Sequence, residues 1–379
     1  MSNAVLITRE PVINKQHKIT ANRLIVHAAS VGQAAEALNS LAEVWPATHP
    51  VFVSLYRLVP TPDLLAWKAP ANAMVEIPTQ AIAHPLTLAL LPRLQEAGIS
   101  LNLTWYQPDT VLPPDVVWRF VIIDAKRQPL PIAPPGLSLA WGLADVPDFR
   151  NAIVSGYDGA SGWFFLQGVK SDGKLAPSHA QIVRLMSLVR RNAEVREIET
   201  ILKQDVALSY KLLRYINSAG FGLMCEIQSF RHAVSILGYD KLHKWLSVLL
   251  ISASRDPSAP ALMQTAIARG RFMEKIGAAF FEKGELDNLF ITGAFSMLHL
   301  LLGASLQSAL DEMNLPTPIR DALIAGDGVY APFLKLARAL ESFDDKHLAS
   351  LADDLHITPE QINRAHLEAL AFADSLQFG

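Results

Sequence analysis

The first 168 residues alternate two kinds of hydrophobic pattern. Short apolar runs are separated by stretches in which apolar residues recur every three or four positions, as at Ala34, Leu38, Leu41 and Ala42. The short runs favour β-strands and the spaced residues favour helices, so their alternation predicts an α/β architecture. The predicted strands cover residues 5–8, 19–27, 51–56, 74–77, 99–106, 116–123, 137–143 and 162–168.

Eight predicted strands indicate a TIM-type (β/α) barrel. A complete barrel of this kind usually needs about 200–250 residues. Because only 168 residues precede the change of pattern, some of the helices that connect successive strands must be reduced or missing. The expected fold of this half is therefore a shortened barrel.

The pattern changes at residue 169. Residues 169–177 contain Gly, Pro, Ser and charged side chains, which is typical of a linker. Beyond them the apolar residues follow helical spacing, for example at Ile182, Leu185, Leu188 and Val189. The chain is thus expected to contain an α/β barrel domain over residues 1–168 and an all-α helical bundle over residues 178–379.

Composition and charge narrow the classes of function. Half of the residues are hydrophobic and 18% are charged, which excludes a disordered chain. A net charge of −3 gives no support for non-specific nucleic-acid binding. The single cysteine, Cys225, excludes an internal disulfide and a zinc site built on several thiolates, and it fits a reducing, cytoplasmic compartment.

Two segments are candidates for membrane targeting or insertion, the N-terminus and the uncharged stretch 289–310, and neither suggests a membrane protein. The N-terminal residues carry Arg9, Glu10, Lys15 and Lys18 and no long apolar run, so no signal peptide is expected. Residues 289–310 have no charge, but polar side chains such as Thr292, His299 and Gln307 interrupt them. A buried helix pair is therefore expected rather than a membrane span, and no membrane partner is predicted.

Local motifs for catalysis are weak. Gly168, Gly173 and Lys174 have the spacing of a phosphate-binding loop, but Leu175 replaces the hydroxyl that would hold magnesium. No two histidines have the i, i+4 spacing of a helical zinc pair. The surroundings of Cys225 contain no basic residue that would activate its thiol, so a buried structural cysteine is favoured.

Three arginines place positive charge early in the second half, at Arg184, Arg190 and Arg191. A solvated helix face is the main interpretation of this charge. A surface that binds an acidic partner or a nucleotide is the alternative.

The stretch DVALSYKLLRYINSAGFGLMCEIQSFRHAVSILGYDKLHKWL resembles the signature of the HDOD family, helical signalling domains related to HD phosphohydrolases. The resemblance implies an HD-related helical bundle, and the chain lacks the metal-binding His-Asp dyad of the enzymatic relatives. Turn and cap roles account for these residues, so they are expected to be structural. The main signature positions are Asp205, Asn217, Ser218, Phe221, Ser229, Gly238 and Trp245.

The first half is similar to EAL domains, and the whole chain resembles bacterial two-domain proteins that join an EAL-type domain to an HDOD domain. TREPVIN at 8–14 resembles the Arg-Gln-Pro-Ile opening of such proteins, and KITANRLIVHA aligns with the naming motif. The resemblance implies a barrel that hydrolyses cyclic di-GMP with two divalent metal ions, whose ligands are carboxylates and an asparagine.

Most positions that would supply this chemistry are altered. Two relict ligand positions keep a carboxylate, at Glu76 and Asp124. The altered positions are Arg23 at the naming glutamate, Ser54 at the asparagine, Thr104 and Trp105 at the paired aspartates, Ile122 at the lysine, Trp141 at the late glutamate and Ser161 at the glutamine. Neither a catalytic residue, nor a metal ligand, nor a cofactor site is therefore predicted.

These expectations lead to one functional hypothesis and two alternatives. The protein is predicted to be a non-enzymatic signal-transduction protein with a degenerate EAL-like domain that acts through protein partners. The first alternative is a receptor that binds cyclic di-GMP without hydrolysing it, and the second is a residual phosphohydrolase.

Overall fold

The computed structural model describes residues 5–167, 177–204, 230–252, 258–303, 305–311 and 315–376. The chain divides into two compact units. The first contains Met1–Gly168 and Arg338–Ala371, and the second contains Val169–Ala337 and Phe372–Gly379.

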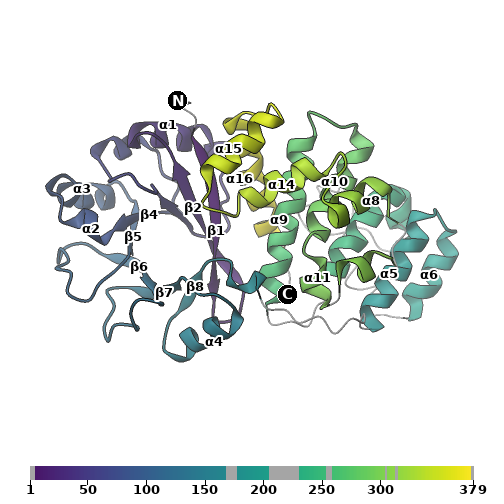
Figure 1. Cartoon of the computed structure of the whole chain (residues 1–379), viewed down its shortest axis with the longest axis horizontal. Helices are drawn as coiled ribbons and strands as arrows, with labels where there is room; N and C mark the ends of the chain where they lie inside the picture. Colours follow the sequence, from purple (N-terminus) through teal and green to yellow (C-terminus); the bar gives the residue numbers. More distant parts are fainter. Residues whose placement is uncertain are drawn as a thin grey trace. The chain divides into compact units, whose positions relative to one another are not determined.

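The first unit is built on a closed barrel of eight strands that follow one another in chain order (Figure 1). Neighbours from β2 to β8 are parallel, whereas β1 is antiparallel to both β2 and β8. The predicted eight-stranded barrel is therefore confirmed. The strands are β1 (Leu6–Asn14), β2 (Ile19–His27), β3 (Val51–Ser54), β4 (Ala73–Pro78), β5 (Ser100–Thr104), β6 (Trp118–Asp124), β7 (Leu137–Trp141) and β8 (Gly159–Ser161).

The helices between the strands are few. They are α1 (Val31–Ser40), α2 (Thr79–Ile82), α3 (Pro85–Glu96) and α4 (Val146–Val154). Residues 105–117 and 125–136, which connect β5 to β6 and β6 to β7, contain no helix. Loops thus replace two of the connecting helices, which explains how the barrel closes within so short a chain.

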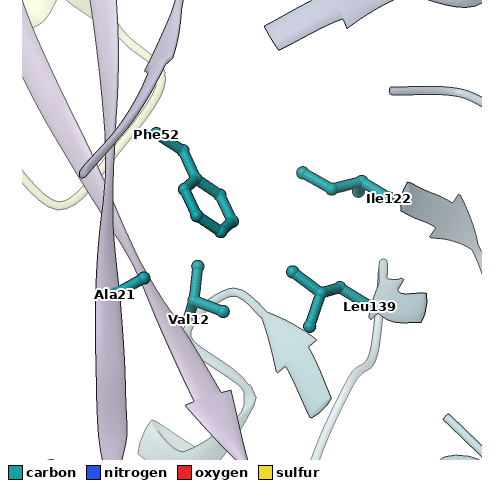
Figure 2. Packing of buried hydrophobic residues seen from close by; sticks show 5 residues of the cluster. All are labelled: Val12, Ala21, Phe52, Ile122 and Leu139. Carbon is teal, nitrogen blue, oxygen red and sulfur yellow. The ribbon is translucent and has the colours of Figure 1, made fainter. Parts of the chain in front are cut away.

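A hydrophobic cluster fills part of the barrel interior. Figure 2 shows its five side chains pointing toward one another from different strands. All five side chains are at most 3% exposed, so this part of the interior is closed to water. The cluster contains Val12, Ala21, Phe52, Ile122 and Leu139.

The last strand lies earlier than the sequence pattern predicts. β8 is Gly159–Ser161, whereas the aromatic residues Phe164–Leu166 form a short 3-10 helix. A Cβ at Gly159 would come within 2.4 Å of the carbonyl oxygen of Ile13. Glycine is thus required where β8 approaches β1, and hydrophobic spacing alone does not reveal this requirement.

The predicted boundary of the helical domain at residue 379 differs from the structure, because Arg338–Ala371 belongs to the barrel unit. β1 pairs with β8 only over Val12–Asn14, and the preceding edge of β1 is hydrogen-bonded by this C-terminal segment. Leu340 O accepts from Arg9 N at 2.9 Å. Asn363 accepts from Ile7 N at 3.0 Å and donates to Val5 O at 2.8 Å. The segment includes α15 (Asp345–Asp354) and most of α16 (Pro359–Ser375). The C-terminal segment thus supplies hydrogen-bond partners to backbone groups of β1 that pair with no strand on this side, which explains why it packs there.

The second unit is helical, as predicted. Its longest helix, α8, contains Gly238 at φ 74°, so two helices meet there at an angle that glycine permits. The described helices are α5 (Pro177–Arg190), α6 (Val195–Gln204), α8 (Phe230–Ser252), α9 (Ala259–Gly277), α10 (Lys283–Phe295), α11 (Leu298–Leu302), α12 (Leu306–Asp311), α13 (Thr317–Arg320) and α14 (Ala331–Ala339).

Close packing of α9 against α10 forms the centre of this unit. The helices cross at Gly270 and Gly293, where a Cβ on Gly293 would lie 2.7 Å from the Gly270 Cα. Lys244 of α8 joins the pair through ion pairs with Glu274 of α9 and Asp287 of α10. Among the described helices, none is both long enough and apolar enough to cross a membrane.

Candidate functional site at the strand ends of the barrel

The positions singled out by the EAL resemblance lie in or directly after the barrel strands. Arg23 is the central residue of β2, and Glu76 lies two residues before the end of β4. Six other positions end their strands or directly follow them: Ser54, Thr104, Trp105, Asp124, Trp141 and Ser161. The carboxyl ends of barrel strands are where enzymes of this architecture place their active sites. The structure therefore brings these six positions to the expected end of the barrel, with Arg23, Glu76 and Ile122 deeper inside the strands.

A buried ion-pair network occupies the centre of this region. Arg23 donates from Nε and Nη2 to the two carboxylate oxygens of Glu76, at 2.6 and 2.8 Å. Its Nη1 donates to Glu10 Oε2 at 2.6 Å. The three side chains are 4%, 1% and 5% exposed for Arg23, Glu76 and Glu10. Short, charge-assisted and partly bidentate bonds fix the guanidinium between the two carboxylates.

The charge of Arg23 is secured by its neighbours. Burial lowers the pKa of the guanidinium, but the charges and hydrogen bonds of Glu76 and Glu10 outweigh burial and raise the pKa above its ordinary value. Arginine therefore stays charged inside this barrel.

Glu10 is the functional residue that reasoning from sequence missed. It also accepts from Ser161 Oγ at 3.2 Å and from Trp141 Nε1 at 3.4 Å. In the structure, Glu10 of β1 lies directly opposite Arg23 of β2. The signal available in the sequence was an acidic and a basic residue at facing positions of two adjacent predicted strands, a pair that stabilises antiparallel sheets.

Asp124, the second relict position, contacts other groups. Its carboxylate accepts from Lys126 N at 3.1 Å and pairs with Arg127 Nε at 3.2 Å. Ile122 is completely buried in the hydrophobic cluster, where a lysine would bring an uncompensated charge. Within the described residues, Asp124 and Ile122 therefore lie outside the hydrogen bonds and ion pairs of the Arg23 network.

The residues at these strand ends do not fit the two divalent ions that the EAL resemblance implies. Divalent metals need several oxygen ligands, whereas here a guanidinium already binds both Glu10 and Glu76. Within the described ranges, no group of three or more His, Cys, Asp or Glu side chains could hold a metal. A positive charge at the same place would repel an incoming cation.

Aromatic side chains cover the neighbouring strand ends. Trp105 and Trp141 pack edge to face with ring centroids 4.8 Å apart. Trp105 adopts φ 59°, a conformation that bulky residues rarely take. These two positions are the ones at which the EAL resemblance expects acidic residues, so an indole pair now stands where oxygen ligands would be needed.

A pocket of about 790 Å³ opens beside the ends of β2 and β3, and all of its lining residues belong to the first unit. His27 lies 3.0 Å from Thr8 Oγ1 through Nε2, and its Nδ1 lies 3.8 Å from Asp345 Oδ1. The centres of the Tyr56 and His27 rings are 4.6 Å apart. The Arg57 guanidinium carbon lies over the Tyr56 ring, 4.9 Å from its centre. Burial lowers the pKa of His27, which Asp345 opposes and Arg57 reinforces. The pocket therefore combines aromatic surface with both signs of charge.

The predicted HDOD signature is only partly described. Asp205, Asn217, Ser218, Phe221 and Ser229 lie outside the described residues. Gly238 and Trp245 lie in α8, and the φ of Gly238 agrees with the predicted turn. The structural role assigned to the signature therefore stays a prediction.

Comparison with known proteins bears on the second half of the chain. Residues 175–311 match the HDOD domain model. Together with the closed barrel before them, this match confirms the predicted arrangement of an EAL-like barrel followed by an HDOD domain. The chain thus joins a barrel of eight strands to a region that matches the HDOD domain model.

Two curated proteins are similar to the chain over much of its length. One is named Cyclic di-GMP phosphodiesterase CdgJ from Vibrio cholerae, with 26% identity over 233 residues that cover 60% of this chain and 54% of CdgJ. The other is named Uncharacterized protein YuxH from Bacillus subtilis, with 22% identity and coverage of 60% and 56%. The matches thus span about half the length of these relatives.

Solved structures that are similar to part of the chain include the FimX EAL domain from Pseudomonas aeruginosa bound to c-di-GMP. It is 15% identical, covers 44% of this chain and 90% of that chain, and has a TM-score of 0.32.

One prediction is corrected by these comparisons. The expectation that the protein is not an enzyme is contradicted by the similarity to a relative named as a cyclic di-GMP phosphodiesterase. That expectation rested on the combined loss of most metal-ligand positions of the EAL resemblance and on the absence of the His-Asp dyad. Replaced ligand positions describe individual contacts, and they do not by themselves establish the activity of a whole protein.

Proposed function

We propose that the protein transmits a signal through contacts with partner proteins, and that its HDOD part supplies the contact surface. The observation that carries this proposal is a groove of about 540 Å³ formed by α5 and α6. Arg184 and Arg191 are exposed at the groove, where Arg191 also pairs with the lining residue Glu197 at 3.0 Å in a solvent-exposed ion pair. Hydroxyls come from Ser187 and Thr200, and Leu188 contributes apolar surface. This combination suits an acidic protein segment, because charge complementarity guides association and apolar contact retains the partner.

The charge of the groove provides the test. The full-length protein and the double variant Arg184→Glu/Arg191→Glu are compared as baits in native extracts, with Arg150→Glu as a matched control. Arg150 is exposed on α4 of the barrel unit and undergoes the same substitution at a single position. A specific protein retained by the wild type and the control, but lost from the double variant, supports the proposal. Equal retention by all three proteins overturns it.

Cyclic di-GMP is the second candidate, and the name of the relative CdgJ favours it. The pocket beside β2 and β3 offers Tyr56 for stacking on a base and Arg57 and Lys346 for phosphate. Binding or hydrolysis of cyclic di-GMP would then be the activity of the barrel.

Calorimetry and a phosphodiesterase assay separate the two candidates. Cyclic di-GMP is titrated into the wild type, into Arg57→Ala and into the control Arg150→Ala, and hydrolysis is followed with Mg²⁺ or Mn²⁺. Saturable binding that Arg57→Ala weakens at least tenfold supports the second candidate, and turnover establishes a phosphodiesterase. Absence of both binding and turnover excludes the second candidate and leaves the protein-contact proposal to its own test.

A further inference from the structure

The inside of the barrel holds two carboxylates and one guanidinium away from water. We infer that Arg23 is a protein-borne replacement for the divalent cations of EAL-type barrels, and that its guanidinium closes Glu10 and Glu76 to metal ions. This inference concerns the ionic requirement of the fold and is independent of the partner proposed above.

The first argument is geometric. Three guanidinium nitrogens donate to three of the four oxygens of Glu10 and Glu76 at 2.6–2.8 Å. The fourth, Glu10 Oε1, accepts from Trp141 Nε1, and Ser161 Oγ adds a second donor to Glu10 Oε2. Every carboxylate oxygen therefore already has a donor from the protein.

The second argument is electrostatic. Two carboxylates inside the same barrel require a nearby positive charge. Removing an ionised group from water without compensation costs several kcal/mol, which is a large part of the total free energy of unfolding of a domain. Arg23 supplies that charge from β2, between Glu10 of the adjacent β1 and Glu76 of β4. A metal ion would serve the same electrostatic purpose, but it would have to displace a permanently charged group.

The third argument comes from the neighbouring positions. Among the other positions that align with EAL metal ligands, those that still carry a side-chain oxygen are Ser54, Thr104 and Asp124. The first two carry hydroxyls, which are weak ligands for Mg²⁺ and Mn²⁺, and Asp124 is paired with Arg127. The side chains around the network therefore add few oxygen ligands that would favour a metal ion over Arg23.

Binding of Mn²⁺ to the full-length protein tests the inference, measured by electron paramagnetic resonance and by thermal unfolding. Tryptophan fluorescence reports on the barrel, because every tryptophan except Trp245 precedes residue 168. The proteins are the wild type, Arg23→Glu, Glu76→Gln, the double variant Arg23→Glu/Glu76→Gln, and the control Arg150→Glu. Arg150 is an exposed arginine on α4 of the barrel unit.

We expect no saturable Mn²⁺ binding at this site and no shift of the barrel transition in the wild type and the control. Arg23→Glu should bind Mn²⁺ saturably, with a melting temperature that rises with Mn²⁺ concentration, because a third carboxylate replaces the cation. The double variant should lose this response. Saturable Mn²⁺ binding by the wild type that Glu76→Gln abolishes, or a folded Arg23→Glu variant that binds no Mn²⁺, overturns the inference.

A second pair of variants decides the matter if Arg23→Glu does not fold with or without Mn²⁺. Arg23→Lys retains a cation at the site, whereas Arg23→Gln keeps hydrogen-bond donors and removes the charge. Support requires that Arg23→Lys lower the melting temperature less than Arg23→Gln. Equal losses would show that the charge is not what the site requires, and would overturn the inference.

Discussion

Each of the two units buries one cation between two carboxylates, but the two cations are held differently. In the barrel, Arg23 lies between Glu10 and Glu76. In the helical unit, Lys244 lies between Glu274 and Asp287, at 2.7 and 2.9 Å from the carboxylate oxygens. The same arrangement of charge therefore appears in a closed sheet and in a helical bundle.

The differences follow from shape and from access of water. The Arg23 fork contacts Glu76 with two nitrogens, and every member of its network is at most 5% exposed. Lys244 is a point charge that also lies 4.5 Å from the centre of the Phe290 ring, and its partners Glu274 and Asp287 are 14% and 24% exposed. The planar guanidinium of Arg23 suits the fixed geometry of a barrel. The ammonium group of Lys244 joins three helices at a site that water partly reaches.

The largest expected effect is on the barrel cation. Arg23→Met should lower the free energy of unfolding of the barrel unit by about 3–5 kcal/mol, because two buried carboxylates lose their counter-charge. Urea unfolding followed by tryptophan fluorescence measures this change. Arg150→Met, at an exposed position of α4, should change the same quantity by less than about 0.5 kcal/mol. A loss below about 1 kcal/mol in Arg23→Met would contradict the interpretation of this network as an essential buried ion pair.

The second prediction concerns two buried histidines, one in each unit. Burial, reinforced by nearby arginines, lowers the pKa of His243 in the helical unit to about 4 and that of His366 in the barrel unit to about 3. The unfolded chain takes up the proton near its ordinary pKa of 6.5, before the folded chain does. Stability from these neutral histidines is thus complete above pH 6.5 and is lost as pH falls toward 4 and 3.

Glutamine substitutions measure this pH effect. His243→Gln should remove up to about 3 kcal/mol of the stability change between pH 7 and pH 4 in the helical unit, with a larger effect from His366→Gln in the barrel unit. Unfolding free energies of each variant and the wild type are compared at intervals of pH, with circular dichroism for the helices and fluorescence for the barrel. Parallel pH curves for variant and wild type would show that the histidine does not contribute.

A smaller effect is expected for the cation of the helical unit. Lys244→Met should lower the free energy of unfolding by about 1–3 kcal/mol, because water reaches Glu274 and Asp287 and moderates the loss of the ammonium. Helical circular dichroism in denaturant measures it, with the exposed Lys283→Met as the matched control. If Lys244→Met cost as much as Arg23→Met, exposure to water would not be the feature that distinguishes the two networks.

The smallest expected effects are on surface ion pairs. Arg364–Glu43 in the barrel unit and Arg191–Glu197 in the helical unit have both partners at least 45% exposed. Glu43→Ala and Glu197→Ala should each change stability by about 0.2–1 kcal/mol, and less at high salt. Chemical unfolding at low and high ionic strength checks this. A loss of more than about 2 kcal/mol at either position would mean that burial does not govern the strength of ion pairs here.

Much of the fold could be predicted from hydrophobic spacing. β2 covers the predicted residues 19–27, and each of the next five predicted runs overlaps one of the strands β3 to β7. β8 was misplaced because its three residues, Gly159–Ser161, include no long apolar run, and the aromatic residues after it resemble a strand. Short strands that are held by backbone approach leave little hydrophobic signal.

The candidate site was predictable in part. Glu76 and Arg23 were identified from aligned positions, but their direct contact was not, and Glu10 was overlooked. The β1–β2 register that places Glu10 opposite Arg23 depends on strand pairing. Asp124 was assigned to the same site, yet a local pair with Arg127 satisfies it.

The sequence by itself determined the class of each half, the number of barrel strands and the residue types at the strand ends, because these depend on local spacing and on position along the chain. Only the tertiary structure decided that Arg23 lies between Glu10 and Glu76, and that residues 338–371 complete the edge of β1. Both outcomes involve groups distant along the chain. They follow from the need of buried charges and backbone groups for partners, a need that is met only when the chain closes on itself.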